Sequence, residues 1–189
     1  MTEFFIHNIE RLTDRGLSSR DFEQQVNIIL ERELSAFRSI NLTIVPISNE
    51  TEVQSIRDAS SVSSTLGIIG VSDHITAALQ MLGKKPEPDF RNSIKESISA
   101  VEALYKLLTG EKTGGLDKAL AKLSNSLPLH SALKAGFLNL YGYSSDENGI
   151  RHAILDMPNL GFAEAKFMLV ACSAAVNFIV DKSREAKLL

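Results

Sequence analysis

Apolar residues recur at intervals of three and four along most of the chain, which is the spacing of one face of an α-helix. The first clear example covers residues 22–37. It predicts an amphipathic helix of about five turns, with Ser18 or Ser19 as its N-cap. A shorter helix is predicted before it, over residues 2–13, and Gly16 would end it.

Residues 38–47 have a different pattern, because β-branched side chains become frequent and the helical spacing is lost. Asn41 stands at a turn-like position, and Pro46 ends the run. A small two-strand β-hairpin fits this pattern. A hairpin of this size is marginal alone, so it would depend on the neighbouring helices.

The run from Gly83 to Asp89, GKKPEPD, is the clearest break in the helical pattern and is typical of a loop. It predicts an N-terminal α+β part over residues 1–85 and a C-terminal helical part over residues 86–189, which could also form one compact unit. The fold class is therefore mainly α, a helical bundle with a small β-hairpin in its N-terminal half. Helices are predicted over residues 50–60, 72–82, 89–109, 115–124, 129–140 and 162–187, with a short one over residues 149–155 and a polar loop or frayed helix end over residues 60–65.

The segment over residues 162–180 is almost wholly apolar and is predicted to be the central core helix, flanked by the helix over residues 89–109. It is long enough to cross a membrane. However, it contains Glu164, Lys166 and Asn177, and a charge deep in hydrocarbon costs about 2.5–3.5 kcal/mol on insertion scales. We therefore expect a buried helix of a soluble protein and no membrane partner.

Composition narrows the class of protein. The 189 residues include 20 Lys and Arg against 23 Asp and Glu, giving a formal net charge of -3, and 44% of the residues are hydrophobic. These ordinary values exclude collagen, coiled-coil rods and wholesale disorder, and they argue against a generally basic nucleic-acid binder while leaving a local basic patch open. Cys172 is the only cysteine, which excludes an intramolecular disulfide and a CxxC metal site. The N-terminus lacks the apolar region of a secretory signal, which predicts a cytoplasmic protein.

The chain contains none of the common nucleotide-binding, zinc-protease or serine-hydrolase motifs. Its four histidines lie far apart in the sequence, so no metal site and no cofactor are expected. The predicted helix over residues 89–109 has an apolar stripe and a polar arc. Within the arc, Glu102 and Lys106 have the i,i+4 spacing of an ion pair worth about 0.3–0.5 kcal/mol. From spacing alone, the polar arc of this helix could be a solvent-exposed face with ordinary ion pairs or part of a functional site.

Residues 141–152 form a second polar cluster that ends in Arg151 and His152. An arginine offers a planar fork for a phosphate, and an imidazole titrates near neutral pH and can move a proton. An alternative interpretation is structural: Ser144 would cap a helix, and Arg151 would pair with Asp146 or Glu147 across the turn. The two interpretations are equally supported by spacing.

Four separated blocks, RNSIKESISAVE (91–102), LYGYSSD (140–146), GIRHA (149–153) and AKFMLVACSA (165–174), occur in this order. Together with residues 37–56, they resemble the abortive-infection proteins of the AbiJ type over about residues 21–180. The resemblance implies a role in bacterial phage defence. It also implies a helical C-terminal half similar to HEPN domains, which are dimeric helical bundles and often metal-independent RNases.

The RNase motif implied by the resemblance is an Arg, a polar residue and a His a few residues later. Arg91 and Asn92 match its first half, whereas residues 96–98 are Glu, Ser and Ile. We therefore consider two functions. In the first, the protein is an antiphage component acting on RNA, with Arg91, Arg151 and His152 meeting at one cleft, which could lie across a dimer interface. There His152 would be the general base and the arginines would hold the phosphate, and the supporting residues would be Asn92, Glu96, Glu102 and Asp146.

In the second, the protein is a non-catalytic helical module: a sensor, a dimerisation domain or an antitoxin-like partner within a defence system. The absence of a His at residues 96–98 and the negative net charge favour this alternative. The expected partners are RNA in the first case, and a second copy of the chain or a companion protein in either case.

Overall fold

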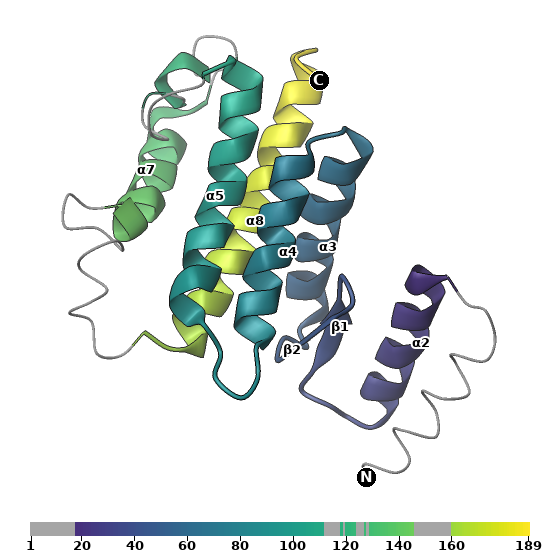
Figure 1. Cartoon of the computed structure of the whole chain (residues 1–189). Helices are drawn as coiled ribbons and strands as arrows, with labels where there is room; N and C mark the ends of the chain where they lie inside the picture. Colours follow the sequence, from purple (N-terminus) through teal and green to yellow (C-terminus); the bar gives the residue numbers. More distant parts are fainter. Residues whose placement is uncertain (1–17, 112–117, 119, 124–126, 128, 146–159) are drawn as a thin grey trace. The chain divides into compact units, whose positions relative to one another are not determined.

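The computed structural model describes residues 18–111, 118, 120–123, 127, 129–145 and 160–189 (Figure 1). These are mainly α-helical with one small antiparallel hairpin, which confirms the predicted mainly helical bundle with a small β-hairpin. The chain divides into two compact units, Met1–Val53 and Gln54–Leu189. The predicted boundary near residue 85 differs from this division, because the helices on its two sides pack against each other. The helices predicted over residues 2–13 and 149–155 lie outside the described residues.

The first unit contains helix α2 (Ser19–Arg32). Ser18 is its N-cap, with a side chain that accepts a hydrogen bond from the backbone N–H of Asp21 at 3.2 Å. The prediction that the apolar spacing would carry this helix to residue 37 is wrong. Leu34 adopts a left-handed conformation with φ of 51°, and the N–H of Ser35 donates to the carbonyl of Leu30. This Schellman arrangement ends the helix at Arg32.

The β-hairpin follows at the predicted place, with β1 (Arg38–Ile40) paired antiparallel to β2 (Thr43–Val45). Asn41 and Leu42 connect the strands, and both have positive φ, 50° and 60°. Two consecutive positive-φ residues form the tight turn whose twist suits a two-residue hairpin. Asn tolerates this conformation better than most residues, which is why the sequence could indicate the turn.

Side chains of α2 hold the outer edge of β1. Asn27 acts like a further strand residue: its Oδ1 accepts from the N–H of Ser39 and its Nδ2 donates to the carbonyl of Ser39, both at 2.8 Å. The Glu23 carboxylate accepts from the Ser39 hydroxyl at 2.9 Å and from the Leu42 N–H at 2.7 Å. Backbone groups that an isolated hairpin would leave to water are thereby satisfied by the helix.

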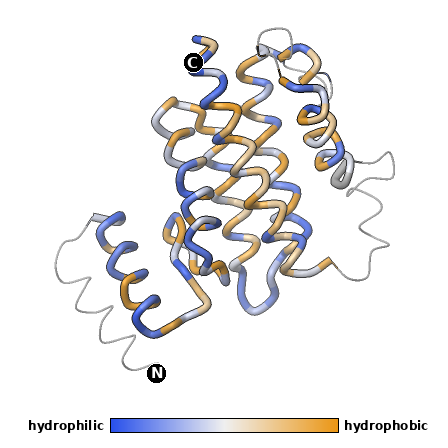
Figure 2. The backbone as a smooth tube through the Cα atoms, turned by 180° about the vertical axis from the view of Figure 1, so that it is seen from behind, coloured by the Kyte–Doolittle hydropathy of each residue, from blue (hydrophilic) through white to orange (hydrophobic). Residues whose placement is uncertain are grey.

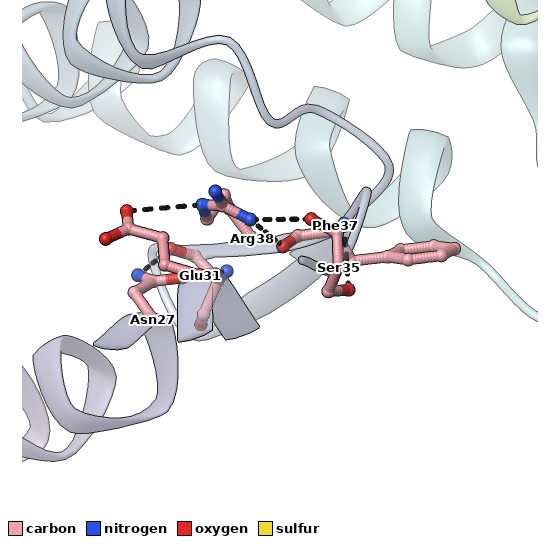
Figure 3. Close-up of polar contacts among 6 residues, drawn as sticks. Asn27, Glu31, Ser35, Phe37 and Arg38 are labelled. Atoms are coloured by element: carbon pink, nitrogen blue, oxygen red, sulfur yellow. Dashed lines mark hydrogen bonds and ion pairs between the residues drawn. The ribbon is translucent and has the colours of Figure 1, made fainter. Parts of the chain in front are cut away.

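The Arg38 side chain binds backbone carbonyl groups in the segment that connects α2 to β1 (Figure 3). Its Nη1 donates to the carbonyls of Ser35 and Phe37, both at 2.8 Å, and its Nε lies 3.5 Å from the Glu31 carboxylate. The Arg38 side chain is only 11% exposed. These polar contacts hold the segment between α2 and β1 in place beside the short strands.

Helix α3 (Glu50–Thr65) contains the division between the two units. The expectation of a loop or frayed end over residues 60–65 is wrong, because the helix continues to Thr65. The hydroxyls of Ser63, Ser64 and Thr65 each donate to the carbonyl four residues earlier, at 2.6–3.0 Å. Small hydroxyl side chains that bond back in this way are compatible with a helix when its inner face is buried.

Helices α4 (Ile69–Gly83) and α5 (Phe90–Thr109) form an antiparallel pair in the second unit. Ser93 in α5 is fully buried and donates its hydroxyl to the carbonyl of Ala78 in α4 at 2.8 Å. This bond between the two helices sets which residues of α4 face which residues of α5. The site described below depends on that register.

Helix α8 (Phe162–Glu185) runs beside α5 and packs on both α5 and α4. The rings of Phe90 and Phe162 meet edge to face at the start of the two helices, with centroids 6.5 Å apart. Asn177 donates to the carbonyl of Ser55 in α3 at 2.9 Å. The prediction that this helix belongs to the core and is flanked by the helix over residues 89–109 is confirmed for one of its sides, whereas Ala163, Phe167 and Ala174 on the other side are exposed. The core of the second unit includes Ile75, Leu79, Leu82, Ile94, Leu104, Tyr105, Met168, Leu169, Val176 and Ile179.

In length and composition, α8 would be able to cross a membrane, and 44% of its most apolar window is buried in the structure. A core helix of a soluble protein meets the same criteria, so the expectation of a soluble protein stays a prediction. Helix α7 (Ser131–Ser145) covers another side of the bundle, as the pattern over residues 129–140 predicted. Residues 118 and 120–123 are also helical, and the side chains of Leu120 and Leu123 are buried.

Candidate functional site

A histidine and a glutamate from different helices meet on the surface of the second unit. Nδ1 of His74 in α4 lies 2.7 Å from the Glu96 carboxylate in α5. The His74 side chain is 38% exposed and that of Glu96 is 21% exposed. A carboxylate bonded to Nδ1 keeps the proton on that nitrogen and leaves Nε2 as the acceptor. The pair therefore combines a fixed imidazole orientation with access from solvent.

The turns next to this pair carry short side chains. On α4, Gly70 and Ala77 lie about one turn before and after His74, and on α5, Ser99 and Ala103 follow Glu96 on the same side. A Cβ built on Gly70 would lie 3.8 Å from that of Ala103, so the two helices are close together here. These short neighbours leave part of the imidazole exposed to solvent.

The start of α5 has a second polar group, built around its N-cap. The Asp89 carboxylate accepts from the backbone N–H of Asn92 at 3.1 Å and from its side-chain Nδ2 at 2.7 Å. These hydrogen bonds lower the pKa of Asp89, with smaller contributions from the positive charges of Lys84 and Arg91, and partial burial opposes them. Asn92, one turn before Glu96, is thus held by Asp89 and keeps its Oδ1 as an acceptor.

Of the residues predicted for the site, the structure describes Arg91, Asn92, Glu96 and Glu102, all on α5. Arg91 is half-buried in the first turn. Glu102 lies 3.5 Å from Lys106, so the predicted i,i+4 pair is present. Its two side chains are 25% and 40% exposed, and an ion pair this accessible to water contributes little to stability.

Arg151, His152 and Asp146 lie outside the described residues, and their predicted roles stay predictions. His74 is the residue that the sequence did not single out. His74 lies within a predicted helix whose recurring residues are apolar. Only the packing of α4 against α5 brings it next to Glu96. A histidine in the helix before a short loop, facing a helix with a polar arc, is the only signal that could have indicated it.

The second unit also contains a small apolar cavity between α5, α7 and α8. Val101, Phe137, Met168 and Cys172 are among the residues that line it, and its volume is about 30 Å³. A site for a metabolite is typically an order of magnitude larger. Burial raises the pKa of the Cys172 thiol to about 12, so this cysteine stays protonated and unreactive at neutral pH.

Metal binding finds no support in the described part of the chain. There, no three His, Cys, Asp or Glu side chains come together in a way that could hold an ion. Searches against protein-family models, curated proteins and solved structures found no match to this chain. The chemistry of the α4–α5 face therefore has to be inferred from its own geometry.

Proposed function

We propose that this protein is a bacterial antiphage component, of the abortive-infection kind, that cleaves RNA without a metal ion at the face of α4 and α5. The observation that carries the proposal is the 2.7 Å pair between His74 and Glu96. Glu96 occupies the part of the chain where the RNase motif implied by the resemblance has a histidine. His74 in the neighbouring helix, which is bonded to Glu96, would supply the imidazole in its place.

The pair has the properties of a general base. Glu96 accepts the Nδ1 proton of His74 and stabilises the imidazolium that forms when Nε2 takes up a proton. In RNA, that proton would come from a ribose 2′-hydroxyl. The 2′ oxygen would then form a bond to the adjacent phosphorus while the bond to the 5′ oxygen breaks, and the imidazolium would return the proton to the 5′ oxygen. The products would be a 2′,3′-cyclic phosphate and a 5′-hydroxyl.

The helix that carries Glu96 also carries two cations that could stabilise the negative charge of a reacting phosphate. Lys95 directly precedes Glu96 and is exposed, and the half-buried Arg91 lies in the first turn of α5, on a different side of the helix from Glu96. A guanidinium or ammonium close to a phosphate stabilises the additional charge of the transition state. Arg151 and His152, if they reach the same face, would add a further cation and a second proton carrier, as the sequence predicts.

The test is cleavage of total RNA and of tRNA in the presence of EDTA by the full chain, alone and with phage lysate. His74→Asn keeps an N–H donor for Glu96 but removes the base, so we expect cleavage to fall about 10²–10⁴-fold. His130→Ala is the matched control, because His130 is exposed and bonds to the backbone N–H of Ala132 in the structure. Cleavage that survives in His74→Asn and is lost in His152→Ala would overturn the role of the α4–α5 pair.

A second candidate function is the non-catalytic binding module. The observation that favours it is the exposed apolar side of α8, where Phe167 is 57% exposed and Ala163 and Ala174 are also exposed. Wild-type protein that cleaves no RNA, with or without phage lysate, would overturn the first proposal in favour of this one. A pull-down from infected cells would then identify the companion protein.

A further inference from the structure

Helix α7 differs from the other helices of the bundle in how little of it is buried. None of its residues over 131–142 is fully buried, whereas α4, α5 and α8 each bury a continuous inner side. Figures 1 and 2 show α7 at one side of the bundle, and in Figure 2 hydrophobic and hydrophilic residues are mixed along it. Because helices in proteins are stabilised mostly by the packing of an apolar side, α7 is held less firmly than its neighbours.

The sequence of α7 also lowers its own helical stability. Gly136 and Gly142 lie within the helix. Apart from the backbone of α7 itself, a Cβ built on either glycine would meet no atom within 4 Å. A glycine inside a helix lowers the stability of that helix relative to alanine, because it loses more conformational freedom on folding. These two glycines therefore weaken α7 although there is room for a side chain at both positions.

The packing beneath α7 is incomplete. The apolar cavity of about 30 Å³ lies between this helix and its neighbours. Phe137 lines the cavity on the α7 side, and Val101, Met168 and Cys172 line it on the side of α5 and α8. The Phe137 ring also lies near that of Phe178 in α8, with centroids 6.3 Å apart. Atoms that face a cavity lose the dispersion contacts that a filled interior would give them, so the contact between α7 and the bundle is weakened further.

We propose that α7 is a movable cover, which undocks from α5 and α8 and unravels while the other helices of the bundle stay packed. Undocking exposes the apolar surface that contains Val101, Met168 and Cys172. The bonds from Ser93 to α4 and from Asn177 to α3 do not involve α7 and remain in place. A free helix of this length is marginal in water, so α7 loses its helical structure when it loses its packing. Local openings of this kind require less free energy than global unfolding.

Cys172 reports this movement, because α7 covers its side of α8. Reaction with a thiol reagent requires the thiolate, and burial raises the pKa of the Cys172 thiol to about 12 while α7 is docked. Undocking brings the thiol into water and returns its pKa towards the ordinary value. Labelling of the native chain is therefore slow, and its rate measures how often α7 is open. This inference is independent of RNA cleavage, because it uses neither His74 nor Glu96.

The first experiment follows thiol labelling of the full chain at urea concentrations below the unfolding transition. The matched control is the variant Cys172→Ala with Ser173→Cys, because Ser173 is the next residue of α8, is 1% exposed and is not among the residues that line the cavity. Without urea, we expect Cys172 to react about tenfold or more faster than the control thiol. Its rate should also depend less on urea, because a local opening exposes less surface than global unfolding. Equal rates with equal urea dependence would overturn the proposal.

The second experiment changes α7 itself and again measures labelling of Cys172. Phe137→Ala should speed labelling about tenfold or more, because it removes apolar contacts between α7 and the bundle. Gly136→Ala should slow it about two- to fivefold, because alanine stabilises the helix that has to unravel. Leu133→Ala is the control on α7, since Leu133 is 39% exposed and does not line the cavity. A rate that neither Phe137→Ala nor Gly136→Ala changes would show that reagents reach Cys172 without movement of α7, and would overturn the proposal.

Discussion

Helices α5 and α8 are neighbours in the same core, yet their outward sides differ. Both bury a continuous inner side, with residues such as Leu104 in α5 and Val176 in α8 fully buried. The outward side of α5 carries charged residues and the pair of Glu96 with His74. That of α8 carries Ala163, Phe167, Val170 and Ala174, with the exposed Asp181 following in its last turns. The inner sides explain why the two helices pack, and the outward sides distinguish a polar surface on α5 from a largely apolar one on α8.

The largest expected effect is on the free energy of unfolding, and it compares a buried leucine of α5 with an exposed one. Leu104 is fully buried, and Leu107, one turn later, is 53% exposed. Leu104→Ala should lower the free energy of unfolding by about 2–5 kcal/mol, because it removes buried methyl groups and leaves a cavity. Leu107→Ala should change it by less than about 0.5 kcal/mol. Urea denaturation followed by circular dichroism measures both. Equal losses for the two variants would contradict the packing of α5.

The next effect concerns the charge of Glu96. Glu96→Gln keeps the length of the side chain and an acceptor for Nδ1 of His74, but it no longer stabilises an imidazolium. We expect RNA cleavage to fall about tenfold or more. Glu102→Gln, on the same helix, serves as the control for loss of one negative charge. A similar loss in both variants would mean that general electrostatics, and not the His74 contact, is responsible.

A smaller effect is expected at the N-cap of α5. Asp89→Ala should lower the free energy of unfolding by about 1 kcal/mol at neutral pH. Because the pKa of Asp89 is lowered from its ordinary value of 3.8 in the folded protein, its charge stabilises the fold above that value, and this contribution is lost as the pH falls through the folded pKa. The difference between Asp89→Ala and wild type should therefore shrink in acid.

Denaturation midpoints at neutral pH and in acid measure that difference. Asp89→Asn is the informative companion, since asparagine caps a helix without titrating and should lose much less than alanine at neutral pH. A difference between Asp89→Ala and wild type that grows in acid would contradict the lowered pKa.

The smallest effect is expected at Cys172, which lies on the inner side of α8. Its thiol has a pKa of about 12 because it is buried, and reaction with thiol reagents requires the thiolate. We expect almost no labelling of the native chain at neutral pH and complete labelling in denaturant. An Ala174→Cys thiol, two residues along the same helix on its exposed side, should react readily in the native chain. Rapid labelling of native Cys172 would contradict the burial of the inner side.

Several elements were predictable because they depend on neighbouring residues. Asn41 in the turn, Ser18 as a cap and the long apolar run of α8 were indicated by local spacing and side-chain chemistry. Two local predictions were wrong for equally local reasons. Leu34 adopted a left-handed conformation and ended α2, although the apolar spacing continued, and the hydroxyls of residues 63–65 bonded within α3 rather than ending it.

The sequence by itself determined the mainly helical class, the hairpin and the polar side of α5, because helical and strand periodicities are properties of residues close together in the chain. Tertiary structure alone decided that His74 meets Glu96 and which side of the apolar helix α8 stays exposed. The first depends on the register between α4 and α5, which the buried bond from Ser93 to Ala78 helps to set. The second depends on which of two apolar sides α5 covers. Neither is a property of neighbours in sequence, because both follow from how separate helices share one core.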